Sequence, residues 1–175
     1  LHTKWSIKMQ LDWNAPIVPG KAMLNLALET SFDDCLALFK TYQNSDNLVK
    51  FKNSPLMKLI IDDSKEVITL NSLDIWELDW QGELAHFSFR NEKLRRITIN
   101  FYKDEFSKGE IHNCRLGSKM ADLLPYYDLD YDDGDESTYV ISNGVYIGLE
   151  LYGSCCDLSQ DPDQIIAGMV VSNIP

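Results

Sequence analysis

The last third of this 175-residue sequence contains no positive charge. From residue 121 onward there is neither lysine nor arginine, although eleven aspartate and glutamate residues occur there. Residues 1–120 carry sixteen acidic and sixteen basic residues, so the formal net charge of −11 arises entirely from the last third. An acidic surface repels nucleic acids and anionic membranes, which argues against both as partners. A basic protein or a metal ion is the kind of partner that such a charge attracts.

The sequence also lacks the motifs of common enzyme and cofactor sites. It has no Gly-x-Ser-x-Gly motif, no phosphate-binding loop and no Gly-x-Gly-x-x-Gly motif. Its three histidines are not spaced as metal ligands, and its four cysteines form no Cys-x-x-Cys pair. We therefore expect no catalytic residue, no metal and no cofactor. The remaining enzymatic alternative is a hydrolase in which Cys155 or Cys156 is the nucleophile and His86 or His112 is the base.

Targeting signals are missing as well. No apolar run is long enough to cross a bilayer, and the first eight residues lack the apolar core of a signal peptide. The cysteine spacing matches no disulfide framework, which favours free buried thiols in a reducing compartment. We predict a cytoplasmic protein that does not bind membranes. The composition, 45% hydrophobic and 25% charged, is typical of a globular protein, and we predict a single domain over residues 1–175.

Alternating or continuous apolar segments predict a β-sheet through most of the chain. Short polar separators such as Gln81-Gly82 and Asn143-Gly144 connect these segments, and connections of this length form hairpins rather than helical crossovers. The predicted strands are therefore antiparallel. They span residues 5–13, 22–28, 56–61, 66–70, 75–80, 84–90, 94–102, 109–116, 138–142, 145–152 and 165–172. A one-residue slip of the apolar pattern at Arg95-Arg96 predicts a β-bulge there.

Two short helices are predicted beside this sheet. Phe32, Cys35 and Phe39 recur at helical spacing, and Thr30 begins a Thr-x-x-Asp capping box, which together predict a helix of about three turns. The second predicted helix spans residues 119–127 and is limited by an internal proline. The predicted fold class is α+β, predominantly antiparallel β-sheet with two short helices.

The sequence repeats itself weakly at a spacing of 88 residues. Residues 24–36 align with residues 112–124, and Thr30 and Ser118 both stand where a helix N-cap belongs. The identical positions are Asn25 and Asn113, Leu28 and Leu116, Asp34 and Asp122, and Leu36 and Leu124. The repeat predicts two related strand–helix–strands halves, residues 1–105 and 106–175, packed into one body.

Residues 126–136, Tyr-Tyr-Asp-Leu-Asp-Tyr-Asp-Asp-Gly-Asp-Glu, contain six carboxylates and three tyrosines without a balancing cation. We interpret this segment as an acidic loop that binds a protein. Tyrosine offers a large contact area at low entropic cost, and the carboxylates can pair with lysine or arginine of a partner. A solvated loop without a binding role is the alternative. The predicted partner-binding residues are Tyr127, Asp128, Asp130, Tyr131, Asp132, Asp133, Asp135 and Glu136.

The same segment matches a calcium-binding loop only in part. With Asp128 as position 1 of an EF-hand loop, Asp130 and Asp132 fit positions 3 and 5. Asp133 then stands at position 6, where glycine belongs, and Tyr139 stands at position 12, where glutamate belongs. A small-ligand or cation-binding module without catalytic activity is therefore the alternative function.

Two loosely related patterns occur in the two halves. The first reads Pro-Gly-Lys from Pro19, then Leu-x-Leu, then Ser-Phe-Asp-Asp from Ser31; the second reads Gly-Glu-Ile from Gly109, then Leu-Gly-Ser and Ala-Asp. In these patterns, and in its small, acidic, non-catalytic character, the sequence resembles the immunity proteins of bacterial polymorphic-toxin and contact-dependent growth-inhibition systems. Such proteins form tight one-to-one complexes with a cognate toxin, frequently a basic nuclease. The resemblance implies that this chain neutralises a basic toxin through its acidic Tyr/Asp-rich surface.

Overall fold

The computed structural model describes residues 10–74 and 82–173. Its main element is a ten-stranded antiparallel sheet, and α1 (Phe32–Thr41) is the single α-helix of the described residues. The fold is therefore α+β and dominated by antiparallel sheet, as predicted. The predicted strand at 75–80 and most of the predicted strand at 5–13 lie outside the described residues.

Every strand of the large sheet pairs with antiparallel neighbours. From one edge to the other the order is β3, β4, β5, β6, β7, β8, β12, β11, β10, β9. The bounds are β3 Gln43–Ser45, β4 Leu48–Val49, β5 Met57–Ile61, β6 Val67–Ser72, β7 Glu83–Arg90, β8 Lys93–Asn100, β9 Asp128–Asp132, β10 Ser137–Ser142, β11 Val145–Tyr152 and β12 Gly168–Ser172. A separate hairpin contains β1 (Ala22–Met23) and β2 (Leu26–Ala27). No helix in residues 10–74 and 82–173 has the length and hydropathy needed to span a bilayer.

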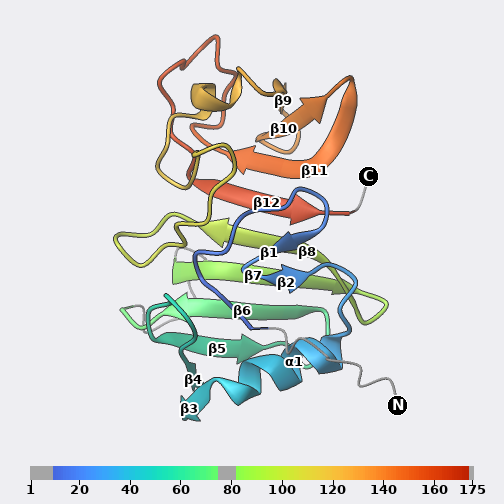
Figure 1. Cartoon of the computed structure of the whole chain (residues 1–175), viewed down its shortest axis with the longest axis vertical. Helices are drawn as coiled ribbons and strands as arrows, with labels where there is room; N and C mark the ends of the chain where they lie inside the picture. Colours follow the sequence, from blue (N-terminus) through green and yellow to red (C-terminus); the bar gives the residue numbers. More distant parts are fainter. Residues whose placement is uncertain (1–9, 75–81, 174–175) are drawn as a thin grey trace, which may run out of the picture.

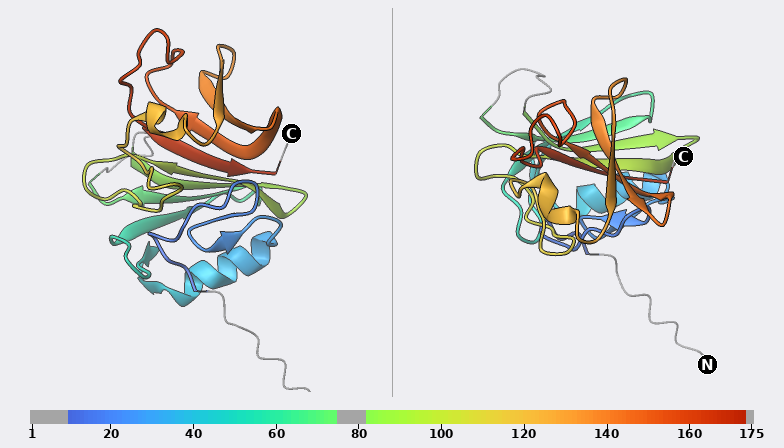
Figure 2. Two further views of the ribbon diagram at one scale, coloured as in Figure 1. Left: turned by 45° about the horizontal axis from the view of Figure 1, so that its top comes forward. Right: turned by 90° about the horizontal axis from the view of Figure 1, so that it is seen from above.

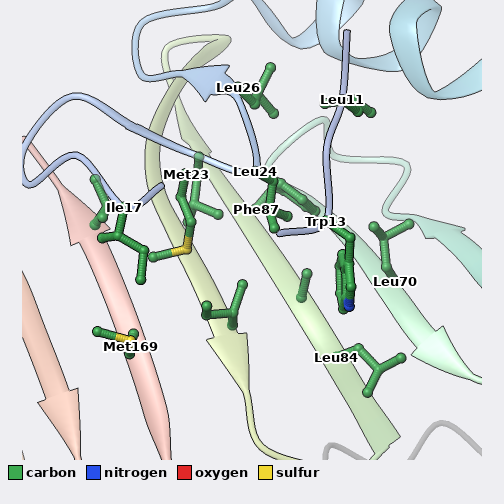
Figure 3. Close-up of a cluster of buried hydrophobic side chains, with 14 of the residues drawn as sticks. Leu11, Trp13, Ile17, Met23, Leu24, Leu26, Leu70, Leu84, Phe87 and Met169 are labelled. Atoms are coloured by element: carbon green, nitrogen blue, oxygen red, sulfur yellow. The ribbon is translucent and has the colours of Figure 1, made fainter. Parts of the chain in front are cut away.

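One face of the sheet is covered by a layer made from residues 10–21, the β1–β2 hairpin, α1 and the segment between β8 and β9 (Figures 1 and 2). Figure 3 shows Leu11, Trp13 and Met23 of this layer in one buried cluster with Phe87 and Met169 of the sheet. All five side chains are at most 1% exposed. Because burial of one large apolar side chain contributes about 1.5–3 kcal/mol, contact between the layer and the sheet is the main source of stability.

The helix α1 begins one residue later than predicted. Ser31 is the N-cap, and its Oγ accepts a hydrogen bond from the backbone N–H of Asp34 at 3.1 Å. The Thr30 hydroxyl instead donates to the carbonyl oxygen of Ala27 at 2.7 Å. Thr30 therefore closes the turn before the helix, and the adjacent serine satisfies the free amide of the first helical turn.

The buried face of α1 consists of the three residues that predicted it. Phe32 packs edge-on against Phe89 with ring centroids 5.0 Å apart, and Phe39 packs edge-on against Phe87 at 5.1 Å. Cys35 lies between these two pairs along the helix and is fully buried. Aromatic pairs in this geometry add about 0.5–1.5 kcal/mol to the free energy of their burial. The helix is thus held against β7 by two aromatic contacts.

The four cysteines are free thiols in different environments, which predicts different reactivity. Burial raises the pKa of the Cys35 thiol to about 12, and burial also raises the pKa of Cys114. Cys155 is exposed and Cys156 is partly exposed. We expect Cys155 to react first with an aromatic disulfide reagent at pH 8, and Cys35 to react only after unfolding, because the thiolate is the reacting species. Titration of native and urea-unfolded protein measures this, and equal native rates at all four thiols would contradict it.

Two predicted strands are interrupted by tight turns. Residues 22–28 form the β1–β2 hairpin rather than one strand. The prediction of a strand at 109–116 is wrong, because Ile111 and Cys114 form only an isolated bridge around a turn. The turn residues have left-handed φ values, which an extended strand cannot contain. These values are 56° at Leu24, 61° at Asn25, 48° at His112 and 61° at Asn113.

The second predicted helix is reduced to a single turn. Residues 119–127 contain only a 3-10 helix, η2 (Met120–Leu123). Lys119 occupies the N-cap position and makes no side-chain hydrogen bond to the helix. Pro125 follows directly after the last turn and has no N–H to continue a helical ladder. Without a cap at one end and with a proline at the other, the segment does not extend into an α-helix.

Two local predictions about the sheet are confirmed. Ser88 pairs with Arg96 and Phe89 pairs with Leu94, so Arg95 has no opposite residue and forms the predicted β-bulge. The turn between β10 and β11 is Asn143-Gly144, with φ of 52° and 75°. This turn was predicted from its two residues, since both central positions of a type I′ turn require positive φ.

The sheet is arranged with approximate twofold symmetry about the central pair β8–β12. Thr98 pairs with Val170, which lies 72 residues further along the chain. The flanking pairs are Ile97 with Val171 and Ile99 with Met169. A shift of 72 residues relates Ile97 to Met169 and Ile99 to Val171, so it converts one flanking pair into the other. The registers of the following pairs relate β7 to β11, β6 to β10 and β5 to β9 in the same way. Among the described residues, β3 and β4 have no counterpart beyond β9.

Backbone features of the covering layer recur at the 88-residue spacing. Positive φ occurs at Glu29 and again at Gly117, as it does at the two turns described above. The Glu29 N–H donates to the Leu94 carbonyl at 2.8 Å, and the Gly117 N–H donates to the Ile166 carbonyl at 2.9 Å. The two halves therefore share local backbone geometry. Their origin in a duplication, and the boundary at residue 105, stay predictions.

Candidate functional site

The segment predicted as an acidic loop contains the strand β9, which forms one edge of the sheet (Figure 1). Asp128, Asp130 and Asp132 are exposed, whereas Leu129 and Tyr131 between them are half-buried. Successive side chains of a strand point to opposite faces, so the three aspartates share one face. Leu129 packs against the hydrophobic core on the other face. The loop prediction was wrong because one apolar face and one neighbouring strand are enough to hold this segment extended.

The other predicted site residues of this segment lie in the turn between β9 and β10: Asp133, Asp135 and Glu136. The turn is held by Asp132, whose Oδ1 accepts hydrogen bonds from the backbone N–H groups of Gly134 at 2.7 Å and Asp135 at 3.0 Å. The Asp135 carboxylate in turn accepts a hydrogen bond from the Tyr139 hydroxyl. The three turn carboxylates are exposed. One aspartate therefore organises the turn, and the remaining carboxylates face solvent.

An exposed apolar and aromatic patch lies at the start of β9. The Tyr126 ring stacks on His112 with centroids 4.0 Å apart and planes 7° apart, and His112 Nε2 lies 3.0 Å from the Tyr127 hydroxyl. Leu124 and Tyr126 are 52% and 51% exposed. Residues 124–128 and 141–143 line a recess of about 220 Å³ beside this patch. A large, ordered apolar area next to carboxylates is typical of residues that anchor a protein interface.

The aspartate face of β9 continues onto β10 and β11. Asp130 pairs with Tyr139, and Tyr139 pairs with Glu150, so these three side chains lie side by side on one face of the sheet. Tyr146 packs edge-on against Tyr139 with ring centroids 5.3 Å apart. Sequence reasoning missed these neighbours. The register that the Asn143-Gly144 turn imposes, together with a strand at β9, would have placed them.

A partly buried ion pair bounds this surface. Arg96 Nη2 donates to Glu150 Oε2 at 3.1 Å and to the Tyr152 hydroxyl at 2.9 Å. The Glu150 side chain is 7% exposed and that of Arg96 is 34% exposed. Burial raises the pKa of Glu150 above its ordinary value of 4.5, although Arg96 opposes this rise. The hydrogen bond to Asp135 and burial raise the pKa of Tyr139 to about 12. Tyr139 is therefore protonated at neutral pH.

The six carboxylates of β9 and its turn are not paired with a cation of the described chain. Among residues 10–74 and 82–173, no ion pair includes any of them. We refer to these six residues as the acidic edge: Asp128, Asp130, Asp132, Asp133, Asp135 and Glu136. Their negative potential is reduced only by solvent and salt, so it extends about one Debye length, roughly 8–10 Å, from the surface.

The alternative site chemistries involve other contacts. Within the described ranges, no group of three or more His, Cys, Asp or Glu side chains is arranged to hold a metal ion. His86 Nδ1 lies 3.1 Å from Glu83 Oε2, and His112 contacts tyrosines. No hydrogen bond of the described chain joins either histidine to Cys155 or Cys156. The pairing of nucleophile and base required by a cysteine hydrolase is thus not formed by these residues.

Comparison with known proteins gives a distant structural likeness and no match to a family or curated protein. No protein-family model matches the sequence, and no curated protein matches it. A solved structure of a cysteine-rich secretory protein from Staphylococcus aureus is similar over 95% of this chain, with a TM-score of 0.36 and 10% sequence identity. This chain spans about half of that protein, 51% of its length. A likeness this weak carries no functional argument.

Proposed function

We propose that this protein is a cytoplasmic immunity protein that binds and neutralises a basic protein toxin through the acidic edge. The observation that carries the proposal is the location of six carboxylates, none of them in an ion pair with a described residue, on the edge strand β9 and its turn. Tyr127 and Tyr131, both half-buried, are the proposed aromatic contact residues next to these carboxylates in the chain. The protein contributes no catalytic group to this function and acts by covering the toxin's surface.

A nuclease is the class of toxin that this surface suits best. A nuclease presents cations to the phosphates of its substrate, and an acidic surface can bind the same cations in place of the substrate. The net charge of −11 also steers a basic partner toward the protein, most strongly at low ionic strength. Fast capture is useful in an antidote, because free toxin acts until it is bound.

The acidic edge also keeps free molecules of the protein apart. An edge strand exposes backbone groups that can pair with another copy, and like charges on two such edges repel each other. A basic partner experiences attraction at the same place. The acidic edge therefore disfavours self-association and favours a basic protein.

Replacing Asp130, Asp132, Asp133 and Asp135 by asparagine tests this proposal. Asparagine keeps a hydrogen-bonding oxygen, so the turn held by Asp132 is retained, and we expect the free energy of unfolding to change by less than about 1 kcal/mol. We expect affinity for the toxin to fall roughly 100-fold at low salt, since four charge contacts of about 0.7 kcal/mol each are lost. Capture of the toxin from lysate of the source organism, followed by calorimetric titration of the purified pair, measures this.

A matched control variant separates the acidic edge from net charge. Asp46→Asn, Asp63→Asn, Glu66→Gln and Asp104→Asn remove four exposed carboxylates elsewhere and change the net charge equally. This control should keep its affinity within about tenfold, because only long-range steering is reduced. Unchanged affinity in the first variant would exclude the acidic edge as the interface. Equal losses in both variants would mean that net charge alone attracts the partner.

A further inference from the structure

The approximate twofold symmetry of the sheet relates its two ends, and the two ends differ. At one end, β5 is paired on its outer side by β4, with Leu48 opposite Lys58 and Val49 opposite Met57. The Leu59 N–H also donates to the Asn47 carbonyl at 2.7 Å. At the other end, β9 is the counterpart of β5, and β10 is its single partner among the described strands. The position occupied by β4 at one end is thus not occupied by a described strand at the other.

The registers identify which backbone groups of β9 are available. Ile60 pairs with Thr69 in the first half, and Asp130 pairs with Tyr139 in the second, so Leu59 corresponds to Leu129. The Leu59 N–H points outward to β4. Because N–H and C=O groups alternate in direction along an antiparallel strand, the backbone groups of Leu129 and Tyr131 point outward from β9. These groups form the ladder that an additional strand would use.

We infer that the partner binds by adding an extended basic segment to β9 as an eleventh, antiparallel strand. This inference rests on the proposed function, because it concerns the same partner and the same edge. Strand addition uses main-chain hydrogen bonds for affinity and alternate side chains for specificity. The chain contains an example of this pairing, because β4 pairs with the outer side of β5 at the symmetry-related end of the sheet.

Charge specifies the side chains of the added strand. Residues opposite Asp128, Asp130 and Asp132 share their face, so lysine or arginine at alternate positions would be cross-strand neighbours of three aspartates. Residues opposite Leu129 and Tyr131 lie on the other face, where Leu129 packs against the hydrophobic core. The segment that fits is therefore an alternation of basic and apolar residues. A second copy of this chain does not fit, because its own β9 carries the same charge.

The other edge of the sheet is less suited to this role. The strand β3 has three residues, and its pairing with β4 contains a register shift between Gln43 and Ser45. The strand β9 has five residues in regular register with β10. Regular extended edges accept additional strands, whereas short or bulged edges do not. Strand addition is thus expected at β9 and not at β3.

A synthetic peptide of eight residues with alternating lysine and valine is the probe for this inference. In the expected register, lysines lie opposite the aspartates, and valine backbone groups bond to Leu129 and Tyr131. We expect peptide binding to slow amide hydrogen exchange at Leu129 and Tyr131, measured by NMR. Methylation of the valine backbone nitrogens should weaken binding at least about tenfold, because two or more hydrogen bonds to β9 are lost. Methylation of the lysine backbone nitrogens, which point away from β9, should change binding less than about threefold.

The outcomes separate this inference from the proposed function. If both methylated peptides bind equally well to the protein, and the four-asparagine variant binds neither, the acidic edge attracts basic segments but strand addition is wrong. If the four-asparagine variant binds the unmodified peptide as tightly as the original protein does, the acidic edge itself is not the interface. Absence of any exchange protection at millimolar peptide overturns strand addition. Circular dichroism and thermal melting of the variant confirm that it is folded in each case.

Discussion

Replacing Arg96 by methionine is expected to lower the free energy of unfolding by about 2–3 kcal/mol at pH 7. The substitution removes the cation beside Glu150, a carboxylate that is 7% exposed, and leaves that charge without its partner. Breaking a buried ion pair on one side costs about 3–5 kcal/mol, and the value here is lower because a third of the Arg96 side chain is exposed. Urea denaturation at pH 7 measures the loss.

The pH dependence of this variant identifies the cause. Burial raises the folded-state pKa of Glu150, and loss of Arg96 raises it further. A group with a raised folded pKa contributes stability below its unfolded value, near 4.5, and that contribution is lost as pH rises through the folded value. The difference between the variant and the original protein should therefore be smaller at pH 4.5 than at pH 7. The double variant Arg96→Met with Glu150→Leu should recover most of the loss. A pH-independent difference would assign the effect to lost packing of Arg96.

The substitution Gly148→Ala adds one methyl group to β11 and is expected to be strongly destabilising. Gly148 has φ of +84°, and a Cβ there would lie 2.5 Å from the Ser172 carbonyl oxygen and 2.6 Å from the Gly20 nitrogen. Both neighbours are backbone atoms, which cannot rotate away. Left-handed strain of about 1–2 kcal/mol and overpacking of about 1–3 kcal/mol together predict a loss of roughly 3–5 kcal/mol. Chemical denaturation followed by circular dichroism measures it.

Gly144→Ala is the matched control for this prediction. Gly144 has a similar φ of +75°, but a Cβ there would have no neighbour within 4 Å. We expect it to lose about 1–2 kcal/mol from backbone strain alone. The difference between the two variants isolates the steric contact between β11, β12 and the turn at Gly20. Equal losses in both variants would mean that the close approach of these backbones is relieved without cost.

Much of the sheet could be predicted from the sequence, because its strands are connected by short polar turns. The turn Asn143-Gly144 specified the β10–β11 hairpin, and the slip of the apolar pattern at Arg95 specified a bulge. The order of the sheet across its centre could not be predicted in this way. The pairing of β8 with β12 joins residues 68 to 76 positions apart, and no local signal in the sequence indicates such contacts.

The conformation of the acidic segment was not predicted, because the structure forms a strand where the sequence indicated a loop. Aspartate is disfavoured in strands, so three alternate aspartates concealed the period-two pattern that Leu129 and Tyr131 provide. The neighbours Tyr139 and Glu150 join the site only through the register of β9 with β10 and of β10 with β11. Such neighbours can be named only once β9 is assigned as a strand.

The central pair β8–β12 has a consequence for synthesis of the protein on the ribosome. Strands β3 to β8 emerge first and can pair with one another, but β12 is the last strand of the sheet to be made. Until then β8 is an open edge, and its apolar face of Ile97 and Ile99 lacks the neighbouring Met169 and Val171. The positive charges of Lys93, Arg95 and Arg96 on this strand repel other nascent chains during that interval. The strand β8, which is central in the complete sheet, is thus an exposed edge strand until β12 has been synthesised.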